Sequence, residues 1–346
     1  LSVLRIDWEI GAYLLLLVAA AALRFWDLGS RAQHHDESLH AVYSYYLYAG
    51  RGYVHDPLMH GPFQFHAIAL LYLLFGDSDF TSRILPAVMG TVAVGLPWFL
   101  RAQLGRAGAL ITAAFICFSP TLLYYSRFVR NDIYIAVWTL LLVIGMWRYF
   151  TSGERKWALL AAISLSLSFA TKEVTYLTMA VFGSYLFLTT ARELLPRVVA
   201  RFDFHGVSNR AAMTLLIGSL TLPQAAAAMD LAWGLHKDFT GVGASPLGEA
   251  LTSIARTWAG IWGLGAAIPD QNTVGKIIAG GTVVLVLFAA SVVLGRRWNW
   301  SLWARCAVAF YVIFFLLYTT FFTNINGFGS GIWGSLEYWL QQHEVQ

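Results

Sequence analysis

The sequence predicts an all-α protein, a polytopic bundle of about nine transmembrane helices. Three observations predict this class: an apolar composition, long apolar runs, and basic residues that fall into alternate connections. Of the 346 residues 58% are hydrophobic and 12% are charged, against about a quarter charged in an ordinary soluble domain. Aromatic residues at 15%, with 14 tryptophans, are typical of a chain that crosses many bilayer interfaces. The composition therefore excludes a soluble globular protein.

The apolar runs give the spans directly, because a helix needs about 20 mostly apolar residues to cross about 30 Å of hydrocarbon. The first run ends in Leu23-Arg24-Phe25-Trp26 without a small-residue cleavage site, so we expect a retained anchor and not a cleaved signal peptide. The fifth run is short. The predicted spans are Gly11–Leu28, Thr81–Leu100, Ala107–Leu123, Ile133–Phe150, Trp157–Ala170, Val174–Thr190, Ala211–Met229, Ile277–Gly295 and Leu302–Phe322.

The net charge of +4 does not indicate a nucleic-acid partner, because the basic residues form no single patch or stripe. Eleven of them fall in four alternate connections that hold only three acids, Glu154, Glu193 and Asp203. Short cytoplasmic loops retain Lys and Arg, so these four loops should be cytoplasmic. We therefore expect a multi-pass protein of the cytoplasmic (inner) membrane with its N-terminus inside. The eleven cations are Arg101, Arg106, Arg148, Arg155, Lys156, Arg192, Arg197, Arg201, Arg210, Arg296 and Arg297.

The outward-facing segments are then the first loop (Gly29–Phe80), the short links near Arg130 and Lys172, the second loop (Asp230–Lys276) and the C-terminal tail. Within the second loop, a Gly-rich stretch carries Trp258 and Trp262 at helical spacing. An interfacial helix and a plain loop packed on the bundle both suit this stretch. Cys117 and Cys306 lie in apolar runs without a CxxC motif, which indicates small core residues.

The first outside loop has an unusual density of polar chemistry: six of the nine histidines and five acids. Apolar residues from Leu39 to Leu47 recur at helical spacing and stop at Gly50, which predicts a short amphipathic helix after Asp36-Glu37. Phe63–Phe75 is too short to span and should form a second interfacial helix. Interfacial helices in this loop are therefore part of the predicted fold.

Asp36 has two interpretations. An acid at a helix start is often an N-cap, whose loss costs about 1 kcal/mol. Paired carboxylates among imidazoles are also what a general base or a metal-assisted transfer to a hydroxyl requires. A divalent metal ion held by Asp36 and His60 is one form of the second interpretation, although no zinc-type spacing is present.

Charges also lie at the predicted outer membrane edge, between spans that leave no room for a long loop. Arg127, Arg130 and Asp132 form one such group, and Lys172 and Glu173 form another. Charges at this depth are costly unless paired or hydrated, so a functional role is the first expectation. Arg and Lys here suit the phosphate of a polyprenyl-phosphate lipid, whereas structural ion pairs are the alternative.

In this order, these features resemble the GT-C class of membrane glycosyltransferases, which includes protein O-mannosyltransferases and aminoarabinose transferases. The chain looks most like the prokaryotic flippase-associated glycosyltransferase-like members. The resemblance covers roughly Arg24 to Leu188. It rests on His35-Asp36-Glu37, Ala49-Gly50 with Tyr53, His60-Gly61-Pro62, Arg83 with Pro86 and Gly90, Tyr125-Ser126-Arg127 through Asp132, and Thr171-Lys172-Glu173.

The resemblance implies a glycosyltransferase that moves a sugar from a polyprenyl-phosphate donor to an acceptor at the extracytoplasmic face, with inversion. It implies that Asp36, with Glu37 beside it, is the catalytic acid. Gly61-Pro62 stands where many members have paired prolines, and no Lys is present in that loop. The donor phosphate is therefore expected at Arg127, Arg130 or Lys172, with Asp132, Glu173 and His35 as further substrate contacts.

Two other classes stay open: a lipid-headgroup flippase or transporter, and a non-catalytic subunit that binds partners in a larger membrane complex. Membrane lipids are expected partners in each case. We treat residues 1–346 as a single transmembrane module. Members of the class commonly carry further spans and an outer soluble domain, so we expect this chain to lack C-terminal parts of a longer protein.

Overall fold

The computed structural model describes residues 7–200, 202–227, 241, 244–261 and 271–341. Within these residues the regular structure is helical, and none of them lies in a β-strand. The elements are α1 (Trp8–Phe25), α2 (His35–Tyr48), η1 (Pro57–Met59), α3 (Phe63–Phe75), α4 (Asp79–Gly95), η2 (Leu96–Leu100), α5 (Arg101–Phe118), α6 (Pro120–Tyr125), α7 (Asp132–Ser152), α8 (Arg155–Phe169), α9 (Val174–Ala200), α10 (Asn209–Thr221), α13 (Pro246–Ile261), α14 (Gln271–Trp298), α15 (Trp300–Tyr318), α16 (Gly327–Gly329), η3 (Ser330–Gly334) and α17 (Ser335–Gln341).

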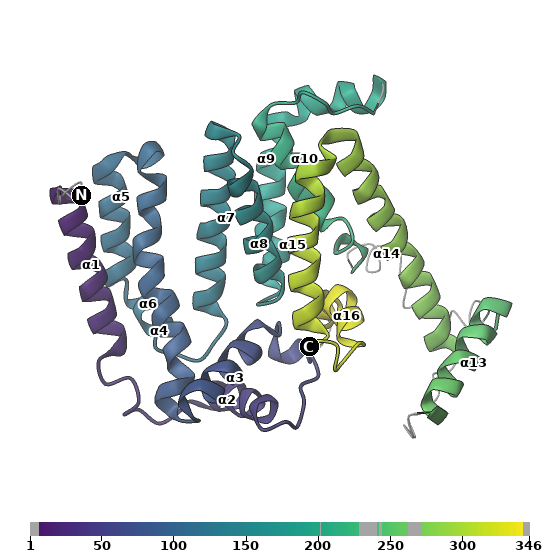
Figure 1. Cartoon of the computed structure of the whole chain (residues 1–346), viewed down its shortest axis with the longest axis horizontal. Helices are drawn as coiled ribbons and strands as arrows, with labels where there is room; N and C mark the ends of the chain where they lie inside the picture. Colours follow the sequence, from purple (N-terminus) through teal and green to yellow (C-terminus); the bar gives the residue numbers. More distant parts are fainter. Residues whose placement is uncertain (1–6, 201, 228–240, 242–243, 262–270, 342–346) are drawn as a thin grey trace.

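The predicted all-α membrane bundle is confirmed, and each of the nine predicted spans overlaps a helix. Among the described residues, six helical stretches are long and apolar enough to cross a membrane. One of them, Asp79–Phe118, turns back near Gly105, whose φ is 73°, so that α4 and α5 stand side by side (Figure 1). Helices α8 and α10 have only 15 and 13 residues and stand among the longer ones.

Several predicted boundaries differ from the observed ones. Helix α9 continues ten residues past the predicted end at Thr190, to Ala200. The apolar run ends near Thr190, but no Gly follows there to end the helix. The last predicted span ends early, at Tyr318, because Thr320, Phe321 and Phe322 all adopt positive φ and turn the chain. The residue at which a helix ends therefore depends more on local backbone geometry than on the length of the apolar run.

The centre of the bundle is held by close contacts between α7, α8, α10 and α15. A Cβ on Gly145 of α7 would lie 2.9 Å from the Trp157 carbonyl oxygen of α8, so the small residue permits this approach. Ser166 of α8 donates to the Phe310 carbonyl at 2.7 Å, and Tyr318 donates to the Phe169 carbonyl at 2.8 Å. Hydrogen bonds of this kind between spans satisfy polar groups that lipid cannot.

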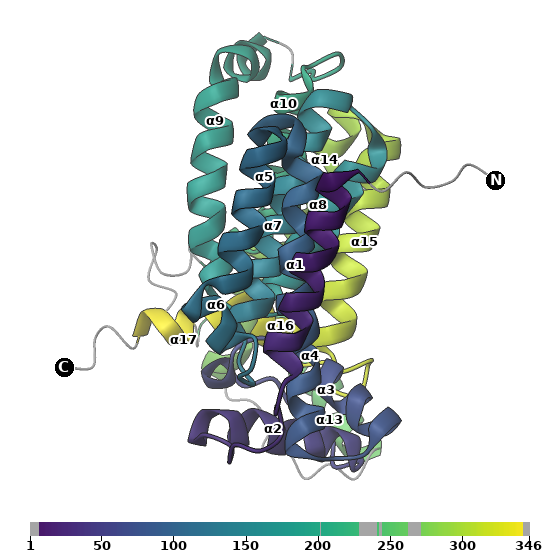
Figure 2. The ribbon, with the colours of Figure 1, turned by 90° about the vertical axis from the view of Figure 1, so that its left-hand side faces the viewer.

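The two ends of the bundle differ in composition, as the alternation of basic loops predicts. At one end, Arg106 pairs with Asp7 and Glu9, and Arg197 caps the turn at His205. At the other end lie α2 and α3, which form a layer across the bundle (Figures 1 and 2). The loops that carry the cytoplasmic-type charge therefore gather opposite the polar first loop.

The first loop folds nearly as predicted. Helix α2 ends at Tyr48, just before Gly50, and α3 has the predicted bounds Phe63–Phe75. In the second loop, α13 provides a helix where an interfacial helix or a plain loop was expected. The side chains of Trp258 and Trp262, on which that expectation rested, lie outside the described part of the structure.

Candidate active site

The start of α2 places two adjacent acids in different surroundings. His34 is the N-cap, and its Nδ1 accepts from the Asp36 backbone amide at 3.2 Å, while the Glu37 carboxylate accepts from the His34 amide at 3.0 Å. This reciprocal arrangement is a capping box. The interpretation of Asp36 as the N-cap is therefore wrong, because His34 and Glu37 satisfy the end of the helix and leave the Asp36 side chain free for other contacts.

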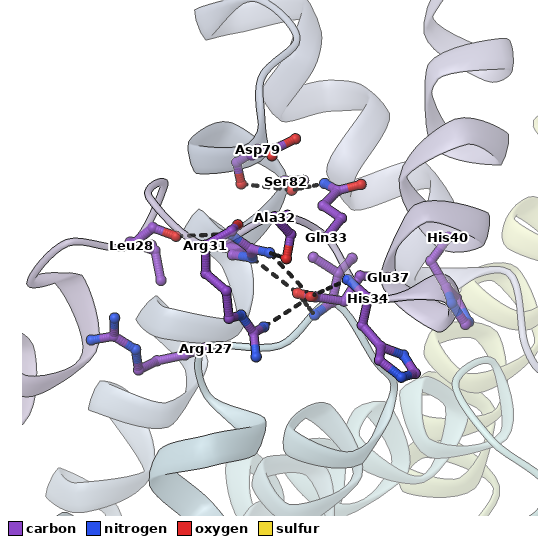
Figure 3. Close-up of polar contacts among 12 residues, drawn as sticks. Leu28, Arg31, Ala32, Gln33, His34, Glu37, His40, Asp79, Ser82 and Arg127 are labelled. Atoms are coloured by element: carbon purple, nitrogen blue, oxygen red, sulfur yellow. Dashed lines mark hydrogen bonds and ion pairs between the residues drawn. The ribbon is translucent and has the colours of Figure 1, made fainter.

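The Glu37 carboxylate is fully buried and enclosed by cations and amides (Figure 3). Arg83 donates to both of its oxygens at 2.9 and 3.0 Å, and Arg31 donates at 2.8 Å. The Val129 amide adds a bond at 3.2 Å. Burial disfavours the charged form, but the bonds from Arg83, His34 and Val129 outweigh it and hold the pKa of Glu37 below its ordinary value.

The Glu37 cluster joins three separate segments of the chain. Arg83 of α4 also donates to the carbonyls of Leu28 and Arg31, at 3.1 and 2.8 Å. Val129 belongs to the link between α6 and α7. The cluster therefore fixes the first loop to α4 and to the α6–α7 link, and it leaves Glu37 without a lone pair to act on a substrate.

The Asp36 carboxylate, by contrast, is 38% exposed and accepts from Arg130 at 2.7 Å. Arg130 lies 3.7 Å from Asp132, whose other oxygen accepts from Lys172 at 2.7 Å. The four residues form a chain of alternating charge, Asp36, Arg130, Asp132 and Lys172. They come from the first loop, the α6–α7 link and the α8–α9 link, and each is partly open to solvent.

A second pair lines the same pocket as Arg130 and Lys172. His60 donates through Nδ1 to Glu173 at 2.7 Å, with side-chain exposures of 9% and 10%. The ring of His60 stacks on Trp339 of α17, with 5.1 Å between centroids. An open pocket of about 470 Å³ lies among these groups, and its polar lining comprises His60, Arg130, Lys172, Glu173, Tyr176 and Trp339.

A close backbone contact at Gly61 positions His60 beside Glu173. Its amide donates to the Thr171 carbonyl at 3.1 Å, and a Cβ at this position would lie 2.3 Å from the Ala170 carbonyl oxygen. Only glycine allows this approach of two backbones. The Gly61-Pro62 pair therefore docks the first loop directly onto the α8–α9 link.

The structure brings six of the nine predicted site residues together, with three exceptions. Ion pairs link Asp36, Arg130, Asp132 and Lys172, and the separate pair of His60 and Glu173 lines the same pocket as Arg130 and Lys172. Glu37 is enclosed in its own cluster with Arg83 and Arg31. Arg127 lines a different pocket, next to Asp27 and Arg31. His35 is exposed at the first residue of α2. The candidate set of phosphate ligands therefore narrows to Arg130 and Lys172.

A metal ion at Asp36 and His60 has little support from the arrangement of these side chains. Asp36 is occupied by Arg130, and Nδ1 of His60 by Glu173. In the described part of the chain, no group of three or more His, Cys, Asp or Glu side chains is arranged to hold a metal. The metal ion stays a prediction, and the reaction proposed for this site uses the side chains alone.

Sequence reasoning missed three residues around the site. Arg31 and Arg83 neutralise Glu37, and Trp339 covers His60 from the far end of the chain. Arg83 is one of the residues that carry the family resemblance, but the sequence predicted no role for it. The tryptophans of the C-terminal segment were likewise given no role. No local pattern predicts which distant acid or histidine such residues contact.

Three comparisons relate the chain to known proteins. A search of curated proteins and a search of solved structures both returned no significant match. A family model does match, over residues 15–204. This range contains the whole charged network from Asp36 to Glu173, and it covers more than half of the chain. The chain therefore belongs to the dolichyl-phosphate-mannose-protein mannosyltransferase family of membrane glycosyltransferases.

Proposed function

We propose that this protein transfers a sugar from a polyprenyl-phosphate donor to an acceptor hydroxyl at the extracytoplasmic face of the cytoplasmic membrane. The observation that carries the proposal is the network from Asp36 to Lys172, which unites a partly exposed carboxylate with two cations beside an open pocket. A general base and a phosphate site are the two parts that such a transfer needs.

In the proposed reaction Asp36 is the general base. The acceptor oxygen attacks the anomeric carbon from the face opposite the phosphate, and its proton passes to the Asp36 carboxylate. The bond between the anomeric carbon and the phosphate oxygen breaks, and its electron pair stays on the polyprenyl phosphate. The sugar is thereby inverted at the anomeric carbon, in agreement with the resemblance.

Arg130 and Lys172 neutralise the phosphate as it leaves. Both cations line the pocket, and both are held by the same acid, Asp132, at 3.7 and 2.7 Å. Negative charge grows on the phosphate as the bond breaks, so cations fixed beforehand stabilise the transition state more than the ground state. Asp132 thus orients the two cations, whereas Glu173 and His60 offer hydrogen bonds to sugar hydroxyls.

The decisive experiment replaces the base without changing its size. For Asp36→Asn we expect release of polyprenyl phosphate from synthetic polyprenyl-phosphate mannose to fall at least ~100-fold, the usual contribution of a general base. Asp77→Asn is the matched control, because Asp77 is an exposed acid of the same loop. A rate for Asp36→Asn within threefold of the unmodified protein would reject the assignment.

The membrane face has a separate test, since Cys117 and Cys306 are buried and give a low background. We expect Arg51→Cys, at the α2 end, to react with a membrane-impermeant maleimide in intact cells. Ser152→Cys, at the opposite end, should react only after the membrane is permeabilised. Both positions are exposed. The reverse pattern of labelling would place the site on the cytoplasmic face.

A further inference from the structure

A second polar pocket lies away from the candidate active site, at the end of α1. It has a volume of about 370 Å³, and its polar lining is Asp27, Ser30, Arg31, Tyr124 and Arg127. In Figure 3, Leu28 and Arg127 lie on one side of Glu37, and His40 lies on the other. The lining of this pocket shares no residue with the lining of the candidate active-site pocket.

Two guanidinium groups give one side of this pocket a positive charge. Arg127 donates to the carbonyls of Leu23 and Asp27, at 2.7 and 3.4 Å, and no carboxylate among the described residues lies within ion-pair distance of it. Arg31 is half exposed and shares Glu37 with Arg83. Arginine binds phosphate well because its planar fork can donate two parallel hydrogen bonds.

A carboxylate gives the same pocket a negative charge. One oxygen of Asp27 accepts from the Ser30 hydroxyl at 2.7 Å, which leaves the other oxygen for a ligand. Asp27 holds a positive φ of 52°, unusual for a residue with a side chain. A purely anionic headgroup would be repelled by Asp27, whereas a headgroup with a phosphate and an ammonium matches both ends.

The position of the pocket suits a lipid headgroup. Helix α1 is at the edge of the bundle (Figures 1 and 2), and only 22% of its residues are buried. Trp26, at its end, is 79% exposed, and Tyr124 beside the pocket is 49% exposed. Exposed Trp and Tyr at a helix end mark the depth of the lipid headgroups. The pocket therefore opens toward the bilayer at the level where headgroups lie.

We propose that this pocket binds the zwitterionic headgroup of a phospholipid, with its phosphate at Arg127 and Arg31 and its ammonium at Asp27. The site is distinct from the proposed donor site, because Arg127 lines this pocket whereas Arg130 and Lys172 line the other one. Since Arg31 also donates to Glu37, the bound lipid would hold the first loop at the membrane surface.

The test adds dioleoyl phosphatidylethanolamine, phosphatidylcholine or phosphatidylglycerol to the purified protein and counts bound lipid by native mass spectrometry. We expect the two zwitterionic lipids to be retained at least threefold better than phosphatidylglycerol. Arg127→Gln should lower their retention at least fivefold, and Arg127→Lys should restore part of it. Arg51→Gln is the matched control, an exposed arginine at the same end that should change nothing.

Asp27→Asn separates the two halves of the headgroup. It should remove the preference for zwitterionic lipids while phosphatidylglycerol still binds, because only the ammonium loses its partner. Equal retention of all three lipids by the unmodified protein, or unchanged retention by Arg127→Gln, would overturn the proposal. Sugar transfer does not enter these measurements, so their failure is distinct from failure of the proposed function.

Discussion

At the scale of single residues, Asp36 and Glu37 show how neighbours in sequence acquire different chemistry. Glu37 points into the protein and is satisfied by two arginines and two backbone amides. Asp36 precedes Glu37 by one residue on α2, so its side chain points to another side of the helix. It is partly exposed and pairs with Arg130. The exposed carboxylate can exchange partners during a reaction, whereas the buried one cannot do so without leaving Arg83 unpaired.

This difference predicts opposite effects of two matched substitutions. Glu37→Gln removes the charge that compensates Arg83 inside the protein, so we expect a loss of about 3 kcal/mol in the free energy of unfolding. Asp36→Asn changes a partly exposed pair and should cost less than about 1 kcal/mol. Unfolding in detergent micelles, followed by circular dichroism, measures both. Similar losses for the two variants would contradict the structural role of Glu37.

At the scale of elements, the candidate active site depends on how the first loop docks onto the link between α8 and α9. Gly61 and Phe63 donate backbone hydrogen bonds to the carbonyls of Thr171 and Ala170, at 3.1 and 2.8 Å. These bonds bring His60 to Glu173 and close one side of the pocket. The site is therefore built by backbone contact between two segments and not by side chains alone.

Gly61→Ala should disturb this contact. Its Cβ would lie 2.3 Å from the Ala170 carbonyl oxygen, and backbone must move to relieve the clash. We expect a loss of about 1 to 3 kcal/mol in stability, as for other overpacked sites, together with at least tenfold slower sugar transfer. Gly183→Ala is the control, because a Cβ there meets nothing within 4 Å. Wild-type transfer by Gly61→Ala would show that the docking is dispensable.

At the scale of the whole molecule, the C-terminal segment contacts the first loop. Thr320 donates to the Tyr53 carbonyl at 3.2 Å, His55 and Ser330 share a hydrogen bond of 2.8 Å, and Trp339 donates to the Pro57 carbonyl at 3.2 Å. These contacts link residues far apart in the sequence. Leu336 and Trp339 of α17 thereby form part of the wall of the candidate active-site pocket.

The histidine in this closure predicts a dependence of stability on pH. Burial lowers the pKa of His55 to about 4 from an ordinary value of 6.5. As the pH falls below 6.5, His55 becomes protonated in the unfolded chain but stays neutral in the folded protein. The free energy of unfolding therefore decreases between pH 6.5 and 4. We expect a loss of about 1 to 2 kcal/mol between pH 7 and 5, where one pKa unit corresponds to ~1.4 kcal/mol.

The matched variant for this effect is His55→Gln, which cannot titrate in this range. Its melting temperature should change less between pH 7 and 5 than that of the unmodified protein. Glu37 does not interfere, since its lowered pKa places its own transition below this window. Equal pH dependence in the two proteins would assign the effect to other groups, such as the buried His40 and the half-buried His66.

The sequence by itself determined the membrane bundle, the approximate helices, the two interfacial helices of the first loop and most of the charged residues of the site. These properties depend on local composition and periodicity, which a single segment carries. Only the tertiary structure decided that Glu37 is enclosed, that Arg127 lies apart from Arg130, and that Trp339 covers His60. Each of these contacts joins residues on different helices, and a side chain's partner there depends on how the helices pack.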